Sequence, residues 1–306
     1  MEHETAETTE NGDAPALRPR VRMSIAIAAI AIIGAWAYQG GAWTRAGIRP
    51  ERVVTVAGER GAARGTVTLP VRWGDLGVKM VSTGVIDRDK LEALYAERGG
   101  LDASSRKLLA SADNENLMIT KENSGLVLNL LWALGLGAKN AILEKGPMAD
   151  PAYGGAGKFA STGGWTLAAG EAMEHYSRHP FIVLTPQQQA LVERVAKNIY
   201  RPCCNNSTYF PDCNHGMAML GLLELMASQG VGEEEMYRAA LRVNELWFPD
   251  TYATIATYLA GKGIRWENAD PKEILGASYS SASGYQKILS QVTTPTRGGG
   301  NRCGVQ

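Results

Sequence analysis

The residues Leu126-Val127-Leu128-Asn129-Leu130-Leu131-Trp132-Ala133-Leu134-Gly135-Leu136 form a run whose predicted helix is apolar on every face. A helix of that kind is buried in a protein core or crosses a membrane. The run has 11 residues, which is fewer than the roughly 20 that a bilayer-spanning helix needs. The sequence therefore predicts a buried central helix with other helices packed around it.

Capping signals predict those other helices. Asp87 precedes the segment 90–96, and Asp102 or Ser104 precedes the segment 107–110. The strongest start is Thr185-Pro186-Gln187-Gln188, a capping box with proline at the first helical position, from which a helix is expected to run to about Tyr200. Further helices are predicted at 216–228, closed by Gly230, at 232–247, at 250–259 and from Asp270 onward. Together these signals predict a mainly α domain over residues 73–292.

The composition limits the classes of partner. The chain has 306 residues, of which 45% are hydrophobic, so it can form a substantial core. Its 31 basic and 31 acidic residues cancel, so no overall positive charge attracts nucleic acid. We therefore expect no nucleic-acid partner.

The N-terminal 44 residues indicate export. A polar arm, residues 1–22, ends in three arginines, and the uncharged segment 23–44 that follows is long enough to span a bilayer. Aromatic residues at its C-terminal side fit the membrane interface. We expect a single transmembrane signal-anchor in the cytoplasmic (inner) membrane, with the domain on the extracytoplasmic, periplasmic side. The alternative is cleavage at Ala35-Trp36-Ala37, which would release the same exported domain.

Two stretches flank the helical domain. Residues 45–72 are rich in small residues and predict a linker with at most a small β element, a short strand at 66–71 that Pro70 would confine to a sheet edge. The Gly-rich residues 293–306 predict a flexible tail, which carries Cys303.

The other three of the chain's four cysteines cluster in the loop 201–216, between two predicted helices. Cys203 and Cys204 are adjacent, and Cys213 and His215 lie close to the start of the next helix. A cysteine near a helix N-terminus has its thiolate stabilised by the helix dipole, which makes Cys213 the expected reactive sulfur. His215 is expected to assist proton transfer or to complete a metal site.

Three functions compete for this cluster. Cys213 and one of the adjacent pair can form a reversible disulfide, which would make the chain a redox protein with a protein thiol or disulfide as partner. The three cysteines and His215 can instead bind a metal cofactor: copper, zinc or an iron-sulfur centre. The third alternative is a structural disulfide in a non-catalytic, membrane-anchored assembly subunit. Adjacent cysteines match no zinc-finger spacing, and an exported domain favours redox chemistry.

The cluster also resembles a known family. Tyr200-Arg201-Pro202-Cys203-Cys204-Asn205-Asn206, then Asp212-Cys213-Asn214-His215, a helix and Gly230-Val231-Gly232-Glu233-Glu234-Glu235-Met236 are similar to the helical hairpin of CcmH-like cytochrome c maturation proteins. The resemblance covers residues 200–250. It implies a membrane-anchored thiol reductant, although the family's two cysteines are separated by two residues and this pair is adjacent.

A second candidate site lies earlier in the chain. Glu171, His175 and His179 recur every four residues, so a helix that starts near Trp165 and continues to His179 would present them on one face. A carboxylate and two imidazoles on one face can bind a divalent metal. We therefore predict these three residues as alternative metal ligands.

Overall fold

The computed structural model describes residues 54–55 and 65–293, which all belong to one compact unit within Arg52–Gln306. The predicted polar arm, the membrane segment, most of the linker and the tail from residue 294 lie outside the described residues. In the part of the chain that is described, no helix combines the length and the apolar composition needed to cross a membrane.

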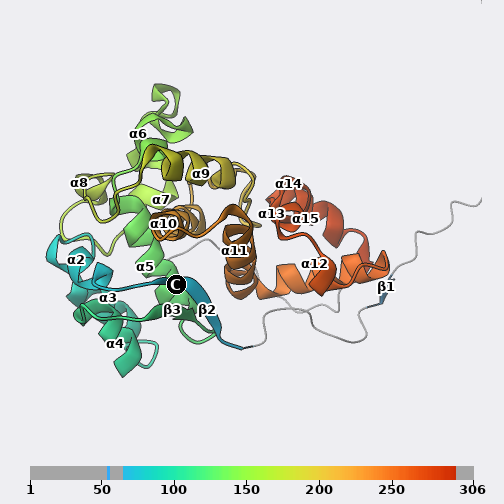
Figure 1. The fold of residues 1–306 in the computed structure, drawn as a ribbon, viewed down its shortest axis with the longest axis horizontal. Helices are drawn as coiled ribbons and strands as arrows, with labels where there is room; N and C mark the ends of the chain where they lie inside the picture. The colour runs from blue at the N-terminus through green and yellow to red at the C-terminus, as the bar shows by residue number, and fades with distance from the viewer. Residues whose placement is uncertain (1–53, 56–64, 294–306) are drawn as a thin grey trace, which may run out of the picture. The chain divides into compact units, whose positions relative to one another are not determined.

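The described residues are mainly helical with a small β element, which confirms this part of the predicted fold class (Figure 1). The α-helices are α2 (Leu76–Ser82), α3 (Arg88–Ala96), α4 (Ala103–Ala110), α5 (Ser124–Gly137), α6 (Ala141–Lys145), α7 (Ala160–Gly163), α8 (Ala172–His175), α9 (Pro186–Ala196), α10 (Asn214–Ser228), α11 (Glu233–Trp247), α12 (Pro249–Gly261), α13 (Pro271–Leu275), α14 (Ala277–Ser280) and α15 (Ala282–Leu289). Short 3-10 helices are η2 (Pro147–Ala149), η3 (Pro151–Tyr153), η4 (Ala156–Lys158) and η5 (Trp266–Asn268).

Two small sheets complete the described structure. β1 (Val54–Thr55) pairs in parallel with β4 (Val292–Thr293), and β2 (Val67–Arg72) pairs antiparallel with β3 (Asn116–Ile119). The predicted strand is therefore present as β2, whereas its partner β3 was not predicted. Leu69 and Val71 of β2 are buried, so this strand contributes to the hydrophobic core.

The core is organised around the crossing of α5 and α10, which lie side by side (Figure 1). Nearly every residue of both helices is buried, as the apolar run in α5 predicts. The two backbones meet at Gly135 and Gly221, where a Cβ atom on Gly135 would lie 2.1 Å from the carbonyl oxygen of Met217. Glycine is required there because any side chain would push the helices apart. The crossing fixes α10, whose first turn adjoins the cysteine loop.

One acidic residue lies within this core. Glu224 on α10 is buried, and its carboxylate accepts a hydrogen bond of 2.6 Å from the Asn140 side chain. Burial raises the pKa of Glu224 well above its ordinary value, because a charge is poorly solvated there, although the bond from Asn140 acts in the opposite direction. The core therefore favours the neutral form of this carboxyl group.

Local capping signals predicted most helix starts correctly. Asp87 and Asp102 cap α3 and α4, and Thr185 and Gln188 form the predicted capping box at α9. The predicted end of α9 at Tyr200 was wrong, since the helix ends at Ala196. The backbone beyond it leaves the helix because the carbonyl of Ile199 accepts from Thr208 and Tyr200 pairs with Ser207.

The predicted helix from Trp165 to His179 was also wrong. Only α8, Ala172–His175, is helical in this stretch. Ser177 adopts a φ of 51°, and the backbone N–H groups of Arg178 and His179 donate to the carbonyl of Gly137 at the end of α5. Tertiary hydrogen bonds to α5 therefore replace the helical bonds that the local sequence permits.

Candidate functional site

The cysteine loop joins α9 to α10 and is held from several sides. The bridge between Tyr200 and Ser207 closes it, and the N–H of Tyr200 donates to the carbonyl of Leu275 at the end of α13. The carbonyl of Cys204 accepts from the N–H of Ala282, the first residue of α15. The loop is thus tied to helices more than 70 residues away in sequence, which fixes the positions of its cysteines.

The three cysteine sulfurs of this loop converge. The Sγ atom of Cys213 lies 3.5 Å from that of Cys203 and 3.9 Å from that of Cys204. All three sulfurs lie within 4.8 Å of one another. A disulfide bond is about 2.05 Å long, so the three are separate thiols in this structure. Cys213 is the central sulfur, adjacent to two alternative partners.

Cys213 is the N-cap residue of α10. Its Sγ atom accepts a hydrogen bond of 3.4 Å from the backbone N–H of Gly216, in the first turn. A cap acceptor at this position satisfies a backbone donor that has no helical partner, and the positive end of the helix dipole lies beside it. A thiolate is a better acceptor here than a thiol. The predicted placement of Cys213 at a helix start is confirmed.

Arg201 is a charged residue that sequence reasoning did not assign to the site. Its side chain is completely buried, and its Nη2 atom donates to Cys213 Sγ at 3.4 Å and to Asp212 Oδ1 at 3.0 Å. Asn206 holds the other oxygen of Asp212 at 2.7 Å. A Cβ atom on Gly216 would lie 2.7 Å from the guanidinium carbon, so only glycine leaves room for this arginine.

The surroundings divide the cysteines by acidity. Hydrogen bonds with Cys203 and Cys204, together with the electrostatic effects of Arg201 and His215, hold the pKa of Cys213 well below its usual range, and these outweigh the opposing effect of burial. For Cys204, the hydrogen bond with Cys203 acts to lower the pKa. The hydrogen bond with Cys213, burial and the charge of Cys213 act in the opposite direction, and together they raise the pKa of Cys204 to about 12. The surroundings therefore favour the thiolate form of Cys213 and the protonated form of Cys204.

Access to solvent differs between the sulfurs. Cys203 and Cys204 are half-buried, whereas Cys213 is only 6% exposed. A partner protein can therefore reach one of the adjacent pair more easily than Cys213. The sequence predicted Cys213 as the reactive sulfur that exchanges with Cys203 or Cys204, and its burial favours the role of internal partner in that exchange.

His215 lies beside the cluster without joining its sulfurs. It is buried, with its ring centroid 4.5 Å from that of Phe248 and 5.6 Å from that of Trp247. Its Nδ1 atom is buried and has no hydrogen-bond partner. The group of converging ligand atoms contains the three cysteines and not His215. The electrostatic effect of the imidazole acts to lower the pKa of Cys213, while its predicted part in proton transfer remains a prediction.

Glu171, His175 and His179 do not share a helical face. His175 Nδ1 and His179 Nε2 are hydrogen-bonded at 3.0 Å, and His175 Nε2 contacts the carbonyl of Ala169 at 2.9 Å. Glu171 is the N-cap of α8 and forms a capping box with Glu174. Among residues 54–55 and 65–293, the three cysteines are the one group of metal-ligand atoms that converges. The helical face predicted to bind metal is not formed.

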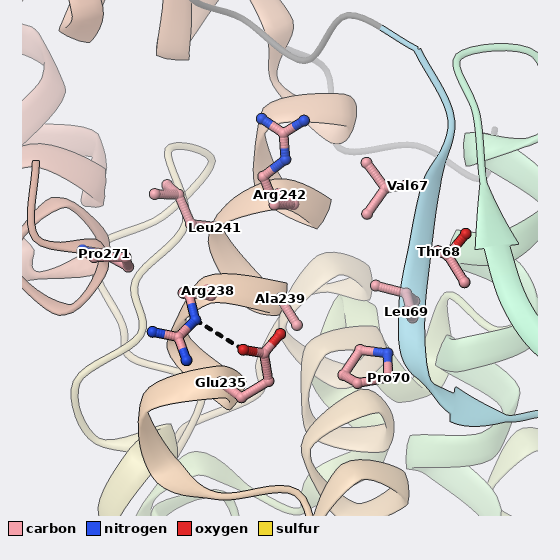
Figure 2. Close-up of a pocket in the computed structure, with 10 residues that line it drawn as sticks. All are labelled: Val67, Thr68, Leu69, Pro70, Glu235, Arg238, Ala239, Leu241, Arg242 and Pro271. Carbon is pink, nitrogen blue, oxygen red and sulfur yellow. Dashed lines mark hydrogen bonds and ion pairs between the residues drawn. The ribbon is translucent and has the colours of Figure 1, made fainter. Parts of the chain in front are cut away.

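A shallow pocket lies between β2 and α11 (Figure 2). Apolar residues of the strand, Val67 and Leu69, form one side of it, and Arg238 and Arg242 extend from the helix. Both arginines are already paired: Arg238 Nε contacts Glu235 at 2.7 Å, and Arg242 contacts Glu245 at 2.8 Å. No cysteine lines this pocket.

Comparisons with protein-family models, with curated proteins and with solved structures find no match for this chain. The resemblance to CcmH-like proteins therefore rests on the quoted residues alone.

Proposed function

We propose that the chain is a thiol-disulfide redox protein in which Cys203 and Cys213 alternate between two thiols and a disulfide. The observation that carries the proposal is the position of Cys213 Sγ, 3.5 Å from Cys203 Sγ and in contact with both the guanidinium of Arg201 and the N–H of Gly216. A short movement joins the two sulfurs, and the contacts at Cys213 stabilise it as a thiolate when they separate.

In the oxidised form, a partner thiolate attacks the half-buried Cys203 sulfur. The bond between Cys203 and Cys213 breaks, and Cys213 leaves as a thiolate stabilised by Arg201 and the start of α10. A second partner thiolate then attacks the partner's own sulfur in the mixed disulfide and releases Cys203. The partner loses two electrons and becomes a disulfide, and the chain gains them as two thiols. The reverse sequence reduces a partner disulfide.

The environment of Cys213 sets the preferred direction. A stabilised leaving thiolate accelerates cleavage of a disulfide and favours its reduced form, as in strongly oxidising thiol proteins. Cys213 combines a helix N-terminus, a buried guanidinium and two neighbouring thiols. These features support oxidation of a partner's thiols by the chain over reduction of a partner's disulfide. The CcmH-like resemblance implies the opposite direction.

The test uses the full chain with Cys303→Ser, so that only the loop cysteines react. With oxidised glutathione, this parent should form a Cys203–Cys213 disulfide and retain no glutathione. Cys213→Ser should accumulate a stable glutathione adduct on Cys203, located by peptide mass spectrometry. Ser207→Ala, in the same loop with all three sulfurs present, should behave as the parent. An adduct that persists equally in the parent and in Cys213→Ser contradicts the proposal.

We further propose that residues 23–44 anchor the chain in the inner membrane, with this loop on the extracytoplasmic side. The uncharged segment after three arginines supports the anchor, and thiol-disulfide exchange fits an oxidising compartment. In intact cells, a membrane-impermeant maleimide should label Cys203 or Cys204 after mild reduction. Labelling only after the cells are lysed would contradict this orientation.

A further inference from the structure

We propose that the reduced form of the cysteine loop binds one Cu(I) ion through Cys203, Cys204 and Cys213, and that formation of the Cys203–Cys213 disulfide releases it. The copper site includes Cys203 and Cys213, the two cysteines of the proposed redox function, and adds Cys204. Copper binding itself follows from the sulfur geometry, and only the release step rests on the proposed function.

The sulfur spacing fits a single ion. An ion held about 2.3 Å from three sulfurs in one plane spaces those sulfurs about 4.0 Å apart. The distances from Cys213 are 3.5 and 3.9 Å, and the third distance is at most 4.8 Å. Iron-sulfur clusters distribute their cysteines over several iron atoms, so sulfurs this close suit one ion and not a cluster.

The number and type of ligands favour Cu(I) over zinc. Zinc in proteins takes four ligands, usually in a tetrahedron. Within the described ranges, no histidine and no carboxylate joins the three sulfurs, and His215 packs against Phe248 and Trp247. A set made only of thiolates selects soft ions, of which Cu(I) is one. The predicted four-ligand site is thereby reduced to three sulfurs.

The buried arginine makes a site with three thiolates electrostatically feasible. Three thiolates bound to Cu(I) carry two negative charges in excess, and burying them without a counter-charge is strongly unfavourable. The Arg201 guanidinium lies 3.4 Å from Cys213 Sγ, and its Nε and Nη1 atoms are buried without hydrogen-bond partners. Their positive potential offsets part of the excess charge. A purely structural disulfide has no use for a buried cation at this position.

Oxidation removes two of the three ligands. A partner disulfide accepts two electrons from the thiolates of Cys203 and Cys213, which become joined, and it leaves as two thiolates. The copper ion keeps its charge and remains in contact with Cys204 alone. One thiolate is a much weaker site than three, so the ion is released. The half-buried positions of Cys203 and Cys204 give it a route to solvent.

The test uses the full chain with Cys303→Ser, reduced and kept without oxygen in detergent. It is titrated with Cu(I) against a coloured Cu(I) chelator, and with Zn²⁺ in a parallel experiment. We expect one Cu(I) per chain with only sulfur neighbours in X-ray absorption, and no displacement by equimolar Zn²⁺. Cys203→Ser, Cys204→Ser and Cys213→Ser should each weaken binding at least about 100-fold, while Ser207→Ala should not. Circular dichroism confirms that each variant is folded.

Three results would overturn the inference: loss of all copper to the chelator, Cys204→Ser binding as tightly as the parent, or displacement by equimolar Zn²⁺. Oxidised chain that binds Cu(I) as tightly as reduced chain would refute the release step. If the reduced chain binds copper but never forms the disulfide, the copper site stands and the proposed redox function fails. If the disulfide forms reversibly but no copper binds, the redox function stands and the copper site fails.

Discussion

Replacing Gly135 by alanine should destabilise the protein, although alanine is the better helix former. The added Cβ would lie 2.1 Å from the carbonyl oxygen of Met217, whereas ordinary contacts begin at 3.4 Å. The helices α5 and α10 must therefore separate by about 1 Å, and overpacking of this kind costs about 1–3 kcal/mol. Helix propensity offsets about 1 kcal/mol, but the separation also weakens the packing of two buried helices. We expect a net loss of about 2 kcal/mol.

Urea unfolding followed by circular dichroism measures this loss, which corresponds to a fall of about 4–8 °C in Tm. Gly221→Ala, which would bring a Cβ within 2.5 Å of the Leu131 carbonyl oxygen, should act similarly. The double variant should lose less than the sum, because one separation relieves both contacts. Ala190→Gly on the exposed face of α9 is the control and should cost about 1 kcal/mol. A more stable Gly135→Ala would refute the close crossing.

Three other substitutions test the site and its support. Arg201→Met should raise the pKa of Cys213, because it removes a charged hydrogen bond of a kind that contributes about 1.5–3 kcal/mol. Arg201→Lys is the control, and thiolate absorbance against pH is the measurement. An unchanged titration would exclude the contact. Glu224→Gln should stabilise the protein at neutral pH. Burial raises the folded-state pKa of Glu224, so the contribution of Glu224 to stability is fully present below the unfolded-state pKa, about 4.3. This contribution declines as the pH rises from there toward the folded-state pKa. Urea midpoints of the parent and of Glu224→Gln that stay parallel across this pH range would contradict the prediction. Thr185→Ala should lose about 1 kcal/mol of unfolding free energy by removing the cap of α9, and an unchanged urea midpoint would argue against the capping box.

Features set by neighbouring residues could be predicted from the sequence. The central helix α5 follows from its apolar run, and the start of α9 follows from Thr185 and Gln188, because the required contacts lie within one turn. The short strand β2 follows from its alternation. Its partner β3 lies more than 40 residues away in sequence, and no local signal identifies it.

The candidate site was predictable only in part. Three cysteines and a histidine within 13 residues identify the loop, and the helix start at Cys213 is a local feature. The burial of Arg201 depends on Gly216 and Asp212, and the loss of the helix before His179 depends on the carbonyl of Gly137. These are tertiary contacts. An arginine next to a proline looks exposed in a sequence, so its part in the site could not be recognised.

The reduction potential of the cysteine loop tests the central claim most directly. The full chain with Cys303→Ser is equilibrated in glutathione buffers over a range of potentials, its thiols are alkylated, and its disulfides are located by mass spectrometry. We predict a reversible two-electron transition that joins Cys203 to Cys213, at a potential above the value of about −300 mV below which structural disulfides lie. A disulfide that these buffers cannot reduce, or no disulfide at any potential, would contradict a redox function.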